Sequence, residues 1–570
     1  MSSGVAQMGC ARLLSDEFSL SLNYYGAETY YSQQAEIVSW CNAPEWPGNL
    51  TDVTRLREEL SETYISARET GKYNPKKRRL IRSGLDVTFV NELDHKRSLE
   101  IYFALLVNPR VSESKISQEF RILVQGQGVH RSVMTTNTTG TGTEVGNYFV
   151  SNYPPFSQWK PEYVGDAIEA LDQAPRTEDP FGLYLHIPFC RKRCKFCYFK
   201  VYTDKNAGEI ELYLDALIKE AELYGRRRAL QGRQLRFAYF GGGTPSYISE
   251  KQLHYLVDGL NRHVSWNNAE EVTFECEPGT LRKSKLETLK EIGVTRLSLG
   301  AEHFDDEILA ANGRAHLSAE IYDVYDLARK VDFPQINLDL IAGMVGETEA
   351  KWRDTVRRTV ELQPDSVTIY QMELPYNTVI SQEIIKQGAV SPIADWETKR
   401  RWLDFAFDEF QARGYRIASA YTVATTAKPC RFIYTDALWH GGDMIGLGVS
   451  SFSHFDGVHF QNAHSFEEYL ALLDQGQLPL LRALTLTEKQ KLIREMILQL
   501  KTGAIELEYF RGKFGVDVWN EFKPVYERLD SEDLVERHNG SINLTRSGLL
   551  QVDHFLSEFF EPELKAVRYV

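Results

Sequence analysis

Three of the seven cysteines stand close together in one short stretch, and they are the residues of this chain best suited to bind a metal centre. Cys190, Cys194 and Cys197 follow the spacing Cys-x3-Cys-x2-Cys. Thiolates spaced this closely on one loop can converge on a single metal centre. Four ligands would complete a zinc site or a fully ligated iron–sulfur cluster, whereas three leave one position open. The spacing therefore indicates a metal centre that can bind a further ligand.

Spacing alone also allows a zinc site with a distant fourth ligand. Cys276, Cys430 and His186 are the candidates for that position. Against zinc, an apolar stretch at 182–187 runs directly into Pro188 and the cysteine loop, and no second Cys-x2-Cys pair follows as in a zinc ribbon. The surroundings favour an iron–sulfur cluster and leave zinc as the alternative.

Residues 180 to about 375 alternate short apolar segments with helical patterns, which predicts a parallel sheet with crossover helices. We expect strands at 182–187, 235–240, 271–275, 296–299, 335–341 and 366–370. We expect helices at 208–230, 249–263, 283–292, 317–330 and 349–361. In a closed or half-closed sheet of this kind, the functional site lies at the carboxyl ends of the strands.

Polar residues stand at that end of successive predicted strands. The turn Gly241-Gly-Gly-Thr-Pro245 follows the second strand, Glu275 ends the third, Glu302 follows the fourth, Arg314 lies on the next connection and Asp339 lies in the fifth. Glycines permit close backbone approach, and their exposed N–H groups can bind a carboxylate or phosphate. Each residue alone could be a helix cap or a surface ion pair. Together they predict the rim of a ligand site.

These motifs resemble those of the oxygen-independent coproporphyrinogen III oxidase-like (HemN-like) family of radical S-adenosylmethionine (SAM) proteins. The resemblance covers roughly residues 145–560 and rests on Tyr-x-His-Ile-Pro-Phe-Cys-x3-Cys-x-Phe-Cys, Gly-Gly-Gly-Thr-Pro, Glu-x-Glu-Pro, Arg-Leu-Ser-Leu-Gly, Gly-Arg-Ala-His and Asn-Leu-Asp-Leu-Ile. It implies an α/β fold, with a partial (β/α)6 barrel followed by a helical, winged-helix-like C-terminal domain. We expect an α+β extension before the barrel, and this extension is foreign to the family.

The resemblance also implies cofactors and site residues. Cys190, Cys194 and Cys197 would hold a [4Fe–4S] cluster whose open iron binds SAM, and an electron donor such as flavodoxin or ferredoxin would reduce it. One electron splits SAM to methionine and a 5′-deoxyadenosyl radical. Members of the family can hold two SAM molecules. The SAM-site positions carried over are Tyr184, Phe196, Gly242, Gly243, Thr244, Glu275, Glu302, Arg314 and Asp339.

Three departures from the family bear on the reaction. Glu302 replaces the glutamine of the family's Gly-Val-Gln, Phe199 replaces a fourth cysteine of the oxidase, and the run 430–439 lacks the His-Asn of the haem-chaperone branch. We therefore expect a radical SAM enzyme that acts on a small unsaturated or porphyrin-like substrate by methyl transfer or cyclopropanation. Coproporphyrinogen III oxidation is the alternative. Non-catalytic haem binding and a zinc-stabilised interaction protein are further hypotheses.

The 570 residues predict several domains. We expect an extension of unknown role at 1–144, a radical SAM core at 145–390, a connecting segment at 391–480 and a helical domain at 481–570. Within the extension, the patterns predict a helix at 51–70 and strands at 85–93, 99–107 and 120–124. The basic run 72–82 is a solvated loop or a site for an acidic partner.

Composition excludes several classes. The net charge of −14 disfavours nucleic-acid binding, no run of eighteen apolar residues could span a membrane, and the N-terminus lacks the pattern of a secretory signal. Seven cysteines, four of them scattered, do not form a disulfide framework and fit a cytoplasmic protein. His454, His459 and His464 could suggest a second metal, but core or loop positions are the simpler expectation. The aromatic stretch 148–159 could line a pocket, although core packing is favoured.

Overall fold

The computed structural model describes residues 149–375, 377–387 and 392–565. The chain divides into two units, Met1–Thr139 and Gly140–Val570, and the description below concerns the second. The helix and strands predicted between 51 and 124 lie outside the described residues, as do Cys10 and Cys41. The predicted boundaries at 144, 390 and 480 stay predictions.

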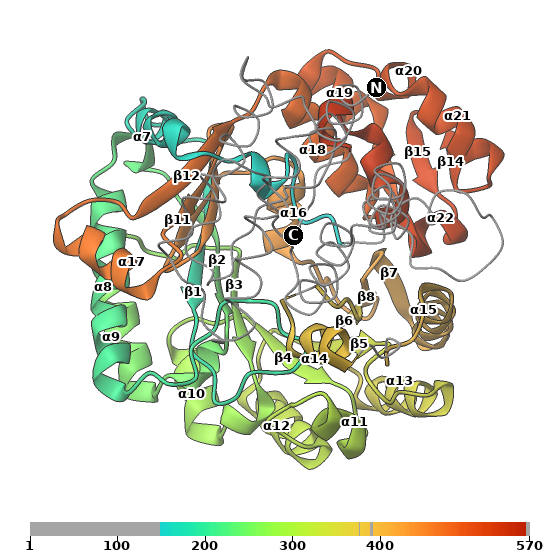
Figure 1. The fold of residues 1–570 in the computed structure, drawn as a ribbon, viewed down its shortest axis with the longest axis horizontal. Helices are drawn as coiled ribbons and strands as arrows, with labels where there is room; N and C mark the ends of the chain where they lie inside the picture. Colours follow the sequence, from blue (N-terminus) through green and yellow to red (C-terminus); the bar gives the residue numbers. More distant parts are fainter. Residues whose placement is uncertain (1–148, 376, 388–391, 566–570) are drawn as a thin grey trace, which may run out of the picture. The chain divides into compact units, whose positions relative to one another are not determined.

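Six parallel strands form the centre of the unit, as the sequence predicts (Figure 1). Each pairs with the next in chain order. They are β1 (Phe181–Ile187), β2 (Leu235–Gly242), β3 (Glu271–Cys276), β4 (Arg296–Glu302), β5 (Gln335–Ala342) and β6 (Ser366–Gln371). Their outward side chains are apolar and buried, so these strands form the core against the surrounding helices.

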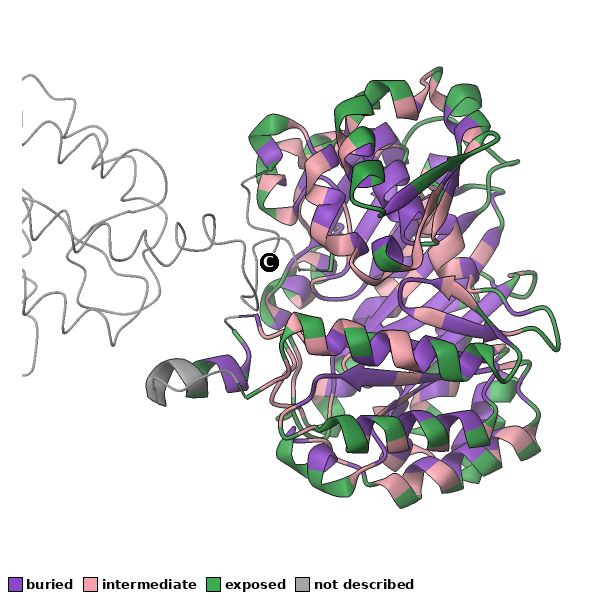
Figure 2. Ribbon diagram, turned by 90° about the vertical axis from the view of Figure 1, so that its right-hand side faces the viewer, coloured by how far each residue is buried: buried purple, intermediate pink, exposed green. Residues whose placement is uncertain are grey.

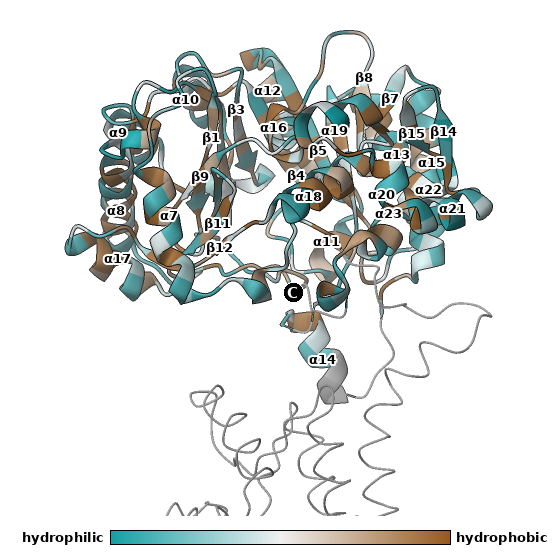
Figure 3. Ribbon diagram, turned by 90° about the horizontal axis from the view of Figure 1, so that it is seen from above, coloured by the Kyte–Doolittle hydropathy of each residue, from teal (hydrophilic) through white to brown (hydrophobic). Residues whose placement is uncertain are grey.

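Crossover helices cover the outer side of this sheet (Figure 1). They are α8 (Ala207–Gly225), α9 (Glu250–Leu260), α10 (Lys283–Glu291), α11 (Asp306–Ala311), α12 (Ser318–Val331) and α13 (Glu349–Leu362). Ser249 and Gln252 form a capping box at the start of α9. The first helix was predicted to reach residue 230 but ends at Gly225, because a separate 3-10 turn occupies Arg228–Leu230. Figure 2 shows these helices buried toward the sheet and exposed outward, and Figure 3 shows hydrophilic and hydrophobic residues mixed along them.

The sheet continues beyond the six strands on both sides to twelve strands. Beside β1 lie β9 (Met444–Leu447), β10 (Phe452–Phe455), β11 (Val458–Asn462) and β12 (Leu480–Thr485), and beside β6 lie β8 (Thr422–Thr425) and β7 (Tyr415–Ser419). The helices among them are α7 (Val164–Leu171), α14 (Val379–Gln387), α15 (Trp396–Gln411), α16 (Ile433–Trp439) and α17 (Phe466–Asp474). Since β9 pairs directly with β1, residues beyond 440 contribute to the same sheet as the cysteine loop.

The C-terminal region is mostly helical with a small antiparallel sheet. Its helices are α18 (Glu488–Leu500), α19 (Leu507–Phe514), α20 (Val518–Glu521), α21 (Lys523–Ser531), α22 (Arg546–Leu550) and α23 (Val552–Phe555), and its strands are β13 (Ala504–Glu506), β14 (Val535–His538) and β15 (Ser541–Leu544). This agrees with the predicted winged-helix-like order of helices and short strands. In the part of the chain that the structure describes, no helix is both long and apolar enough to cross a membrane.

Two aromatic residues of the stretch before the barrel pack into the core, which is the use that the sequence favours. Tyr153 and Trp159 are buried, and the Trp159 ring stacks on His459 with 5.0 Å between ring centroids. His459 and His454 form a buried pair with their Nδ1 atoms 3.0 Å apart, whereas His464 is exposed. These histidines are therefore core and loop residues.

Candidate active site

The cysteine loop begins where β1 ends. Its backbone is fixed by two hydrogen bonds to a returning segment: the Cys190 amide donates to the Tyr202 carbonyl at 3.0 Å, and the Tyr202 amide donates to the Pro188 carbonyl at 2.8 Å. The Cys197 amide donates to the Cys194 carbonyl at 3.1 Å, which turns the loop back on itself. All three thiols are free and partly buried. A short, anchored loop thus presents them together at the carboxyl end of β1.

The glycine-rich turn after β2 packs directly against this loop. A Cβ atom on Gly243 would lie 2.8 Å from the Pro188 carbonyl carbon and 3.0 Å from Cys190 Sγ, so only glycine fits there. The next residue holds the loop from the same side: the Thr244 amide donates to the Phe189 carbonyl at 2.8 Å, and its hydroxyl donates to Cys190 Sγ at 3.3 Å. The predicted turn is therefore a cradle for the first cysteine.

Arg314 joins the cysteine loop to the strand β4. The short helix α11 and the turn after it bring its guanidinium back to the barrel, where Nη1 donates to Cys194 Sγ at 3.3 Å and Nη2 donates to the Gly300 carbonyl at 2.8 Å. The Glu302 carboxylate lies 3.5 Å from Nη2. A positive charge is thus held between a thiol and a carboxylate, 120 residues from Cys194 in the sequence.

Three carboxyl groups face the inside of the half-barrel. Glu275 accepts from the Tyr239 hydroxyl at 2.7 Å and from the Gly242 amide at 3.2 Å. Asp339 accepts from the Ser298 hydroxyl and from the Asn337 side chain, both at 2.9 Å.

Burial in this interior disfavours the charged forms of the three groups. It raises the pKa of Glu275 to about 7 and the pKa of Glu302 to about 7, and it raises the pKa of Asp339 as well. The cluster of carboxyl groups is therefore suited to receive a cation.

Two predicted aromatic positions complete the set. The Tyr184 hydroxyl lies 3.2 Å from His186 Nδ1, and its ring stacks beside Tyr239 with 5.8 Å between centroids. Phe196 is half-buried against an apolar cluster that includes Met344. The structure therefore places the residues predicted from the sequence at one end of the barrel and on its inner face.

Sequence reasoning missed two residues of this interior. Tyr370 lies on the same face of the sheet as Asp339, because Asp339 pairs with Thr368 two positions earlier on β6. The residue is 45% exposed, and partial desolvation together with the nearby Asp339 and Glu275 carboxyl groups raises the pKa of its hydroxyl. Arg296 is buried at the start of β4 over the Phe432 ring, 4.0 Å from the centroid. Alternation along the predicted strands could have indicated both.

The three candidates for a fourth zinc ligand each have another contact within the described residues. Cys276 contacts the carbonyl of Phe274, Cys430 contacts the carbonyl of Asp365, and His186 pairs with Tyr184. Within the same described ranges, no three His, Cys, Asp or Glu side chains are arranged as they stand to hold a metal ion.

Comparison with known proteins identifies the family. The Radical SAM superfamily profile matches residues 184–359, and the HemN C-terminal domain profile matches residues 486–550. The heme chaperone HemW of Haemophilus influenzae is 30% identical over 275 residues, which span 48% of this chain and 70% of that protein. The chain belongs to the HemN-like family of radical SAM proteins.

Two further relatives extend the likeness. The oxygen-independent coproporphyrinogen III oxidase of Pseudomonas aeruginosa is 29% identical over 444 residues, which span 74% of this chain and 94% of that protein. The structure of coproporphyrinogen III oxidase (HemN) from Escherichia coli, described as a radical SAM enzyme, aligns with a TM-score of 0.63 at 23% identity, over 72% of this chain and 96% of that one. The similarity to the Escherichia coli structure establishes that this chain has the same fold.

Proteins of this superfamily use a [4Fe–4S] cluster and SAM, and the residues present fit both. Three cysteines on one anchored loop match the ligand number of a cluster with one open iron, although their side chains, as the structure describes them, are not arranged to hold a metal ion. The space that a Cβ on Gly243 would fill lies against Cys190 Sγ, and Arg314 brings a positive charge to Cys194. Carboxyl groups of Glu275 and Asp339 stand where they can accept hydrogen bonds from an ammonium or hydroxyl group.

Proposed function

We propose that this chain is an enzyme that cleaves SAM reductively and uses the resulting radical on a small unsaturated or porphyrin-like substrate. The observation that supports it most is the position of Arg314, which links Cys194 to Glu302 at the carboxyl end of the barrel. When bound, the cluster supplies the electron that splits SAM into methionine and a 5′-deoxyadenosyl radical. Cys190, Cys194 and Cys197 hold that cluster.

The remaining residues bind and orient SAM. Arg314 is placed to pair with a methionyl carboxylate, since its guanidinium forms bidentate hydrogen bonds with carboxylates. Glu275 and Asp339 accept hydrogen bonds from the ammonium or ribose hydroxyl groups. Phe196 and Tyr184 offer aromatic surfaces to the adenine or a second SAM molecule.

Two departures from the oxidase favour methyl transfer or cyclopropanation as the outcome. Phe199 stands in place of the fourth cysteine, and its ring is 50% exposed beside Tyr198. Glu302 adds a carboxylate to the SAM site. Coproporphyrinogen III oxidation remains the second candidate, because the chain spans nearly all of the Pseudomonas oxidase and has Glu275, Arg314 and Asp339 in the site.

The cysteine loop also suits a protein electron donor such as flavodoxin or ferredoxin. Lys192, Arg193 and Lys200 are exposed on it beside the exposed rings of Tyr198 and Phe199, although the chain as a whole carries a net charge of −14. Basic groups around an apolar patch favour an acidic partner.

Anaerobic reconstitution tests the proposed function. The protein should bind about four irons and release 5′-deoxyadenosine with dithionite and SAM. Cys194→Ala should abolish this release, because the cluster loses a ligand. S-adenosylhomocysteine formed alongside 5′-deoxyadenosine would select methyl transfer, and carbon dioxide from coproporphyrinogen III would select oxidation. Stoichiometric haem binding without release of 5′-deoxyadenosine would overturn the proposed enzymatic function and favour a haem-binding chaperone.

A further inference from the structure

Glu302 has a backbone conformation that residues other than glycine rarely adopt. Its φ angle is 64°, in the left-handed region, and it lies where the pairing of β4 with β5 shifts register. The His303 amide donates to the Ala301 carbonyl at 2.8 Å, so the chain turns sharply at this residue. A non-glycine residue in this region persists only where its surroundings hold it. The carboxylate that faces Arg314 therefore depends on a local support.

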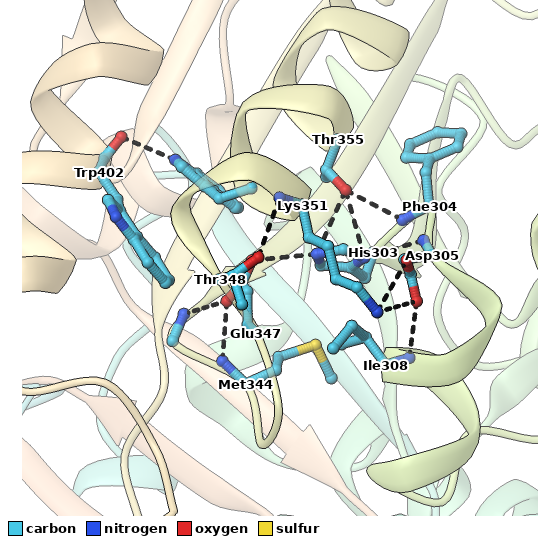
Figure 4. Close-up of polar contacts among 12 residues, drawn as sticks. His303, Phe304, Asp305, Ile308, Met344, Glu347, Thr348, Lys351, Thr355 and Trp402 are labelled. Carbon is cyan, nitrogen blue, oxygen red and sulfur yellow. Dashed lines mark hydrogen bonds and ion pairs between the residues drawn. The ribbon is translucent and has the colours of Figure 1, made fainter.

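The next residue supplies that support (Figure 4). His303 is fully buried, and its Nε2 lies 3.0 Å from Glu347 Oε1, whose side chain is equally buried. The Asp305 amide donates to His303 Nδ1 at 2.9 Å, so Nδ1 is an acceptor and Nε2 carries the proton. His303 therefore donates to Glu347 with its orientation fixed from both ring nitrogens.

Glu347 ties this histidine to the turn after β5. Its second oxygen accepts from the amides of Gly343 at 2.6 Å and Met344 at 2.9 Å, as Figure 4 shows for Met344. A second link runs parallel: Asn312 donates to the Val345 carbonyl at 3.0 Å and accepts from its amide at 3.1 Å. Two links thereby join the connection that follows Glu302 at the end of β4 to the turn that follows β5.

We propose that His303 is a positioning residue for Glu302: through its hydrogen bond to Glu347, it holds the Glu302 backbone so that the carboxylate enters the SAM site against Arg314. This inference rests on the proposed function. It assigns to a buried pair outside the site the task of keeping a negative charge inside it. The charge favours a ligand with sulfonium and ammonium groups.

A double-mutant cycle tests the proposal in the reconstituted holoenzyme. Equilibrium dialysis with labelled SAM, without reductant, measures Kd for the wild type, Glu302→Gln, His303→Ala and the double variant. Each single change should raise Kd about tenfold, and the double variant should be no weaker than Glu302→Gln, because His303 acts through Glu302. His303→Gln, which can still donate to Glu347, should stay within about threefold of the wild type.

Controls separate this proposal from its premise. His254→Ala, a half-exposed histidine on α9 that pairs with Glu291, should leave Kd unchanged. Iron content and thermal unfolding confirm that each variant is folded and loaded. A wild type that binds no SAM would overturn the proposed function itself. SAM binding in the wild type with additive losses in the double variant, or an unchanged Kd in His303→Ala, would overturn the role of His303 alone.

Discussion

At the scale of single residues, the site is a group of acids whose ionisation depends on burial. Glu275 accepts hydrogen bonds from two donors, which lower its pKa. Desolvation by burial has the larger effect and raises the pKa to about 7. Glu302 behaves in the same way. The charge of the site therefore changes near neutral pH, although the ordinary range of a glutamate lies well below it.

This predicts the pH dependence of SAM binding. In the proposed SAM site, Glu275 loses its proton as pH rises from 6 to 7.5 and would then attract the cationic groups of SAM, so Kd should fall by up to about tenfold. In Glu275→Gln the decrease in Kd over this pH range should be smaller, and ionisation of Glu302 should account for the decrease that remains. Equilibrium dialysis of the reconstituted protein measures it. Binding that weakens over this range in the wild type would contradict the assignment.

The cradle around the first cysteine makes a second prediction. In Gly243→Ala the new methyl group collides with Pro188 and Cys190 Sγ, so the loop must move and the reconstituted protein should hold less than about half the wild-type iron. Iron and sulfide analysis provides the measurement. Gly165→Ala is the matched control, because a Cβ there meets no atom within 4 Å and should leave iron content unchanged. Full iron content in Gly243→Ala would show that the loop adapts.

At the scale of elements, one buried acid joins α8 to the second half of the sheet. Glu220 on α8 accepts from the Gly448 amide at 2.8 Å, from Asn462 at 2.6 Å and from the Tyr469 hydroxyl at 2.5 Å. These partners lie on or near β9, β11 and α17. Burial outweighs the three donors and raises the pKa of Glu220 to about 8.

The sign of the resulting pH effect follows from linkage. The folded chain holds this proton up to about pH 8, and the unfolded chain releases it near 4.5. The stability that it contributes is complete below the unfolded pKa and is lost as pH rises, by up to about 1.4 kcal/mol per pH unit. Urea unfolding of wild type and Glu220→Gln between pH 5.5 and 7.5 isolates the group. The wild type should lose stability relative to the variant, and parallel curves would contradict this.

At the scale of the whole described unit, the segment 149–163, which we call the strap, joins elements that lie far apart in the sequence. The Val150 amide donates to Asp553 at 3.0 Å, and Lys501 donates to the Val150 carbonyl at 2.6 Å. Further along, His459 Nε2 lies 3.0 Å from the Tyr153 carbonyl, and Trp159 is buried. The strap therefore connects the β10–β11 hairpin with the C-terminal helices.

Truncation tests what the strap contributes. A chain that starts at residue 145 retains the strap and should match a chain that starts at Gly140 in iron content and unfolding temperature. A chain that starts at residue 164 loses Tyr153 and Trp159, each worth about 3–5 kcal/mol when removed from a core. Its Tm should fall by about 10 °C or more. Calorimetry of both chains provides the comparison, and equal Tm values would show that the strap is dispensable.

Much of the fold follows from local patterns. The six predicted strands match β1 to β6 within a few residues, because apolar runs bounded by turn residues identify buried parallel strands. The extension of the sheet by β7 to β12 was not predicted. These strands are short, and β9, which joins β10 to β12 to the central sheet, pairs with residues more than 200 positions away, as Met444 does with Gly182. Nothing local to such a segment specifies its partner.

The sequence by itself determined that the three cysteines, the glycine turn and the acidic residues after the strands belong to one end of the sheet. Their spacing along one loop, or their place at the end of a strand, is enough to predict this. The tertiary structure alone decided how they meet. Arg314 reaches Cys194, Glu302 turns inward on a left-handed backbone, and His303 meets Glu347 in the core. These contacts depend on the packing of separate connections, which the order of residues along any one of them does not reveal.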